Sequence, residues 1–156
     1  MKQLLLIFAT SFLFVACNQS TSNQLNEQEK QSIKAEVQKI CNSLINLASN
    51  LDLKLFDFYD SSSSIVASGQ IFNYVDRRKA FSEGTANAKS QKFTKKFEDI
   101  WVLDKDNVYW LWHGDVLETF KNDSSFTSKD VSVTSLFRRV GNNWKVMYSH
   151  ESVPCP

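Results

Sequence analysis

The second half of the chain constrains the fold most, because aromatic and β-branched residues recur there between regularly spaced turns. Such residues are typical of β-strands. We predict four long strands, over residues 93–103, 108–120, 131–140 and 144–150. The segments between them are short and polar: 104–107, 121–125 and 141–143. Strands joined by such short turns pair antiparallel, so this half predicts one antiparallel sheet.

Residues that alternate along a strand point to opposite faces of a sheet, which assigns the faces of the 108–120 strand. One face carries Val108, Trp110, Trp112, Gly114 and Val116, and the other carries Tyr109, Leu111, His113, Asp115 and Leu117. Both faces carry large apolar side chains. One face can pack on helices, and the other would then form a surface that contacts a second subunit. We therefore expect a homodimer through the outer sheet face, with His113 directed outward.

Helices are predicted before the strands. Asn26 and Glu29 have the spacing of a capping box, and apolar residues recur every three or four positions from Ile33 to Leu51. A short helix over 53–59, capped by Asp52, should end at the serine run 61–64.

A short strand pair, 65–68 and 71–72, should flank the turn at Gly69, and Asp76 should cap a third helix over 77–89. Helices first and strands afterwards predict an α+β fold.

The N-terminus has the pattern of a bacterial export signal. Lys2 precedes an apolar run over 4–16, which is too short to span a bilayer, and Cys17 follows. A cysteine at this place resembles the lipobox, which implies a signal peptide over 1–16 and lipid attachment at Cys17. A polar tether over 17–26 would then join the lipid to a domain over 27–154. We expect a lipid-anchored protein of the bacterial cell envelope, on the periplasmic side.

Two cysteines remain, Cys41 and Cys155, and they either form a disulfide or stay as a core residue and a free thiol. No spacing of Cys and His suggests zinc, and we expect no metal or cofactor. The 18 basic and 17 acidic residues nearly cancel, so nucleic acid is not an expected partner.

The C-terminal motifs carry a family resemblance. They are Phe137-Arg138-Arg139 before the last turn, Trp144-Lys145-Val146 after it and His150-Glu151-Ser152 at the strand end, with Asp106-Asn107-Val108 opening the second long strand. Together with the element order over 27–154, they resemble the SnoaL-like branch of the nuclear transport factor 2-like superfamily. The resemblance implies a cone-shaped, cystatin-like α+β fold, in which a curved sheet wraps the first helix around a pocket. The superfamily holds both enzymes and binding proteins, so the fold implies no particular reaction.

The candidate pocket residues are Tyr59, Tyr74, Trp110, Trp112, Trp144, Tyr148 and His150. The tryptophans either stack on a flat ligand or simply form the core. The leading hypothesis is a non-catalytic domain that binds a small, largely apolar molecule or serves as a dimerisation module. The alternative is an isomerase- or dehydratase-like enzyme, in which His150 and Tyr148 work with an aspartate from the helical side, drawn from Asp57, Asp76, Asp99 or Asp115.

Overall fold

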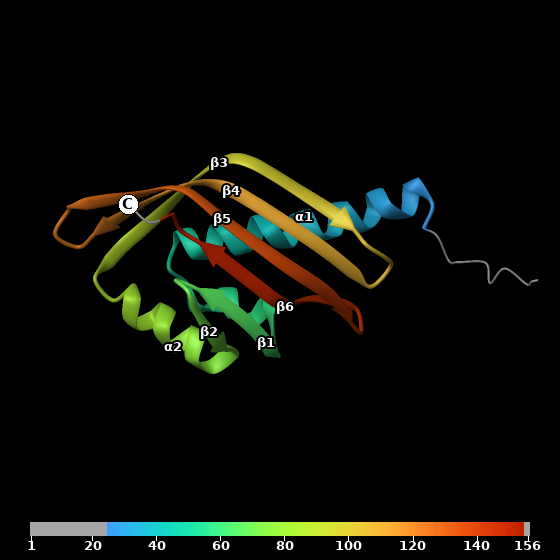
Figure 1. Ribbon diagram of the computed structural model, residues 1–156, viewed down its shortest axis with the longest axis horizontal. Helices are drawn as coiled ribbons and strands as arrows, with labels where there is room; N and C mark the ends of the chain where they lie inside the picture. The colour runs from blue at the N-terminus through green and yellow to red at the C-terminus, as the bar shows by residue number, and fades with distance from the viewer. Residues whose placement is uncertain (1–24, 155–156) are drawn as a thin grey trace, which may run out of the picture.

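The computed structural model describes residues 25–154, which form one six-stranded sheet with helices on one side (Figure 1). The elements are α1 (Glu27–Ser49), the 3-10 helix η1 (Leu53–Phe58), β1 (Tyr59–Ala67), β2 (Gln70–Asn73), α2 (Tyr74–Gly84), β3 (Ala88–Val102), β4 (Asn107–Phe120), β5 (Ser125–Val140) and β6 (Asn143–Ser152). The strand order is β2-β1-β6-β5-β4-β3. All neighbours pair antiparallel except β1 and β6, which are parallel. The predicted α+β class is confirmed.

The long helix α1 begins and packs as its sequence predicts. The Asn26 side chain accepts from the Glu29 backbone N at 2.9 Å, and the Glu29 carboxylate accepts from the Asn26 backbone N at 2.8 Å. Its buried residues are Ile33, Val37, Cys41 and Leu44, spaced three or four apart so that one stripe faces the sheet. No described helix combines the length and apolarity needed to cross a membrane.

The serine run after η1 is part of a strand, so the first strand begins earlier than the predicted range of 65–68. β1 begins at Tyr59, and its ladder with β6 joins Ser64 to Tyr148 and Ala67 to Glu151. The ladder shifts register between Tyr59 and Ser64, and within this shift the Ser62 backbone N donates to Asp60 Oδ1 at 2.8 Å. Ser63 is only 2% exposed. The predicted pairing around Gly69 is confirmed.

The third helix lies earlier in the chain than predicted. α2 ends at Gly84, and its N-cap is Asn73, whose side chain accepts from the Asp76 backbone N at 2.9 Å. The error follows from choosing Asp76 as the cap when Asn73 offered the same chemistry three residues earlier. The residues after Gly84 form a turn and then β3.

The predicted faces of β4 are confirmed, and the sheet bends beside this strand. Val108, Trp110 and Trp112 are at most 3% exposed on the helical side. The ladders with β3 and β5 both shift register near Gly114, through a bulge at Lys96 and another before Val131. A Cβ atom on Gly114 would lie 2.2 Å from the Thr94 carbonyl oxygen, so β3 approaches β4 here as only glycine allows.

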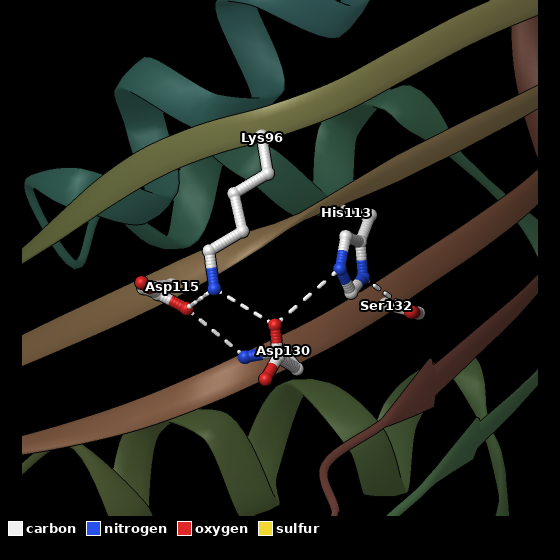
Figure 2. Close-up of polar contacts among 5 residues, drawn as sticks. All are labelled: Lys96, His113, Asp115, Asp130 and Ser132. Atoms are coloured by element: carbon white, nitrogen blue, oxygen red, sulfur yellow. Dashed lines mark hydrogen bonds and ion pairs between the residues drawn. The ribbon is translucent and has the colours of Figure 1, made fainter.

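The two bulges bring polar residues together on the outer face, as Figure 2 shows. The Lys96 ammonium contacts carboxylate oxygens of Asp115 at 2.6 Å and Asp130 at 2.7 Å. Its hydrogen bond holds the pKa of Asp115 below the usual range. His113 faces outward as predicted, with Nδ1 3.0 Å from the Ser132 hydroxyl and Nε2 3.6 Å from Asp130. This cluster joins β3, β4 and β5 at the bend.

Replacing Gly114 by alanine should destabilise the protein, because the new methyl group would force β3 and β4 apart. We expect the free energy of unfolding to fall by about 2 kcal/mol or more. Gly84→Ala is the matched control, since nothing lies within 4 Å of its Cβ position. Urea unfolding followed by circular dichroism measures both variants, and equal stability of the two would contradict the close approach.

Candidate functional site

A cavity of about 340 Å³ lies between the helices and the inner face of the sheet. Its wall is mostly apolar and includes Leu44, Phe56, Phe81, Phe93, Trp110 and Val131. These residues come from both α-helices, η1 and the strands β3 to β5. The bent sheet supplies one wall and the helices the other, so the cavity follows directly from the fold.

One charged pair belongs to the cavity lining. Arg77 of α2 donates from a terminal guanidinium nitrogen to Glu151 Oε2 of β6 at 2.7 Å. Their side chains are 15% and 28% exposed, so the pair is largely withdrawn from water. The guanidinium also lies over the Phe81 ring, 5.9 Å from its centroid.

Tyr59, the first residue of β1, lines the same cavity. Burial raises the pKa of its hydroxyl to about 12, and the Glu151 carboxylate adds to the rise. A hydrogen bond with Ser149 and the charge of Arg77 oppose it. Tyr59 is therefore a neutral hydroxyl at physiological pH, able to donate or accept a hydrogen bond.

A bulge in β6 decides which side chains of this strand reach the cavity. Leu136 of β5 pairs with Tyr148 and Phe137 pairs with Val146, which leaves Met147 unpaired. After this extra residue the alternation changes sides, so Ser149 is buried while Tyr148 and His150 are exposed. Strict alternation over the predicted strand 144–150 would place Trp144, Val146, Tyr148 and His150 on one face, and the bulge makes that placement wrong.

Of the seven predicted pocket residues, Tyr59 and Trp110 are in the cavity lining. Trp112 is buried against Phe93, with ring centroids 5.6 Å apart, and Trp144 is buried beside α1, donating its indole N–H to Glu36 at 3.0 Å. Tyr74 packs edge-on against Phe56. Among the described lining residues there is no histidine or aspartate, so the four candidate aspartates lie elsewhere.

Sequence reasoning missed Arg77 and Glu151. Glu151 stands in the His150-Glu151-Ser152 motif, but alternation along β6 without a bulge would place it on the face opposite the cavity. Arg77 sits in a helix without a clear apolar stripe, so no local signal marks it.

Of the three cysteines in the sequence, Cys41 alone lies within the described residues. Cys41 is fully buried on α1, and burial raises the pKa of its thiol. Cys155 and Cys17 lie outside the described residues, so the disulfide and the lipid attachment stay predictions. Within residues 25–154, no group of three or more His, Cys, Asp or Glu side chains is placed to hold a metal ion.

Comparison with known families gives a match over most of the domain. A protein-family model described as a SnoaL-like domain matches residues 37–156. A search of curated protein sequences finds no match.

Several solved structures share the fold. A nuclear transport factor 2-like superfamily protein from Salmonella enterica superposes with a TM-score of 0.70 at 11% identity, covering 81% of this chain and 94% of that one. A Novosphingobium aromaticivorans protein provisionally assigned as a scytalone dehydratase gives 0.71 at 5% identity, covering 82% and 89%. The association domain of the C. elegans kinase CaMKII gives 0.64 at 13% identity, covering 81% and 99%. Identities this low show the fold alone, and they confirm the expected nuclear transport factor 2-like architecture.

The raised pKa of Tyr59 predicts a loss of stability in alkali. Its hydroxyl titrates near pH 10 in an unfolded chain and near pH 12 in the folded protein. The folded state keeps a proton that the unfolded state has lost, so the contribution is complete below pH 10 and disappears as pH rises through 12. Between about pH 9 and about pH 11.5, the wild-type protein should lose roughly 1–2 kcal/mol more stability than Tyr59→Phe. Urea unfolding at both pH values measures this, and equal losses would contradict it.

Proposed function

The chain belongs to the SnoaL-like domain family, and we propose that its domain is a non-catalytic binder of a small, largely apolar molecule. The observation that supports this is the cavity of about 340 Å³, whose wall is mostly aliphatic and aromatic. Its volume falls in the range of ligand pockets, roughly 300–1,000 Å³. Burial of an apolar ligand against such a wall supplies the binding free energy.

Proton transfer is the second candidate function, because a carboxylate and a neutral hydroxyl line the same cavity. Enzymes that shift protons beside a carbonyl use this pair of groups. Glu151 and Tyr59 would take the roles first given to His150 and Tyr148. Arg77 already engages Glu151 at 2.7 Å, however, which favours binding over turnover.

We further propose that the outer sheet face joins two copies of the chain. Four side chains form one row across the sheet, because ladder partners join Trp101 to Tyr109, Tyr109 to Leu136 and Leu136 to Tyr148. Trp101 is 41% exposed and Tyr148 38% exposed, which is unusual for large rings on a sheet face. A second copy of this row would cover them.

A lipid on Cys17 would tether the domain to the membrane of the cell envelope, on the periplasmic side. The support is the apolar run before this cysteine.

Filling the cavity should weaken ligand binding. Ala80 lines the cavity, so Ala80→Trp places an indole inside it. The affinity for 2-methylnaphthalene, measured by tryptophan fluorescence, should fall by about tenfold or more. Ala86→Trp adds the same indole at an exposed position outside the lining and serves as the control. Failure of the wild-type protein to bind the probe would count against the proposed function.

Lysines in place of Trp101 and Tyr148, at the two ends of this row, should separate the dimer. We expect the wild-type protein to sediment as a dimer and the variant W101K/Y148K as a monomer, because a buried unpaired ammonium is costly. Val75→Lys is the control, since Val75 is 68% exposed on α2, away from the sheet face. A monomeric wild-type protein would refute the interface.

Replacing Cys17 should abolish lipid attachment. We expect acyl groups on the wild-type chain, which should lie in the membrane fraction of a bacterial host, and we expect Cys17→Ala to stay unprocessed and without acyl groups. Mass spectrometry of the N-terminal peptide detects the acyl groups, and an unmodified wild-type Cys17 would refute the anchor.

A further inference from the structure

We propose that the ligand carries a neutral polar head that both accepts and donates hydrogen bonds, as a primary carboxamide does, and that Arg77 and Glu151 bind this head. The inference rests on the proposed function, because it says which ligand group binds at the polar end of the same cavity. It names a ligand class: a flat or compact apolar body with one uncharged acceptor–donor group.

The donor on the protein side is the guanidinium of Arg77. One terminal nitrogen donates to Glu151, and Nε is buried without a hydrogen-bond partner among the described residues, so a ligand does not reach Nε. The side chain as a whole is 15% exposed and lines the cavity, and a guanidinium carries five N–H groups. A terminal N–H group that Glu151 does not engage would therefore donate to a ligand oxygen.

The acceptor on the protein side is the second carboxylate oxygen of Glu151. Its Oε2 accepts from Arg77, which leaves Oε1 able to accept from a ligand N–H or O–H group. Tyr59 lies on the same lining with a hydroxyl that stays protonated, so it adds no charge. The two charged residues thus offer one donor and one acceptor side by side.

The charges of the lining favour a neutral head over a charged one. The lining contains one cationic side chain, Arg77, and two carboxylates, Glu118 and Glu151. A ligand carboxylate would add a third negative charge to a largely apolar cavity. A ligand ammonium at Glu151 would lie beside the guanidinium that already neutralises this carboxylate, so only Glu118 would offer it a carboxylate without that neighbour. Burying either charge costs more than burying a carboxamide whose hydrogen bonds are satisfied.

Four ligands that share a naphthalene ring and differ in their head group test the proposal on the full-length protein. They are 2-naphthamide, 2-naphthoate, the ammonium form of 2-(aminomethyl)naphthalene and 2-methylnaphthalene, with affinities measured by isothermal titration calorimetry. We expect 2-naphthamide to bind about tenfold or more tightly than each of the other three. Tighter binding of the carboxylate or the ammonium would overturn the inference, as would equal binding of 2-methylnaphthalene. Those results leave the proposed function intact, whereas absence of binding by all four probes overturns both.

Two double variants test whether Arg77 and Glu151 cause the preference for 2-naphthamide. The variant R77M/E151M replaces the charged pair by apolar side chains and should bind 2-naphthamide and 2-methylnaphthalene equally, while its binding of 2-methylnaphthalene shows that the cavity is folded. The variant K79M/E83M is the matched control, because this ion pair lies on the same helix with both side chains at least 67% exposed. It should keep the wild-type preference. A preference that survives in R77M/E151M would overturn the assignment to Arg77 and Glu151.

Discussion

The sheet must bend around α1, and that bend at Gly114 is the constraint on which the rest of the structure depends. β4 runs through the bend with unbroken alternation, while β3 and β5 each take up an extra residue beside it. The glycine lets the Thr94 carbonyl approach where any side chain would block it. Bulges increase the bend of a strand locally, so the inner face becomes concave. The helices cover only part of that concave face, and the cavity is what remains.

The outer side of the same bend shows how the bulges are held. Lys96 belongs to the bulge in β3 and Asp130 to the bulge in β5, and both meet Asp115 of the straight strand between them. Asp130 has a positive φ of 55°, which a short polar side chain tolerates. The ion pairs are partly exposed and weak singly, but they link three strands at the position where the ladders are interrupted.

Features set by neighbouring residues could be predicted from the sequence. The capping box of α1, its apolar stripe and the alternation of β4 each depend on side chains a few positions apart, and each agrees with the structure. Family motifs then supplied the fold that local patterns could not. The polar residues of the cavity were harder to predict, because Tyr59, Arg77 and Glu151 come from three elements, β1, α2 and β6. One extra residue at Met147 moved Tyr148 and His150 outward and Glu151 inward, and nothing in the local pattern indicates a bulge there.

The parallel ladder between β1 and β6 also escaped prediction, since it joins segments separated by nearly the whole sheet. That ladder sets an order of events for the growing chain. β1 cannot complete its pairing, and Glu151 cannot join Tyr59 in the cavity lining, until the last strand has been synthesised. Contacts so distant in sequence cost loop-closure entropy before they yield any stability, which slows folding. The domain therefore closes only when its C-terminus arrives, and a chain interrupted before β6 would leave the cavity without Glu151 and β1 without the strand that joins it to β5.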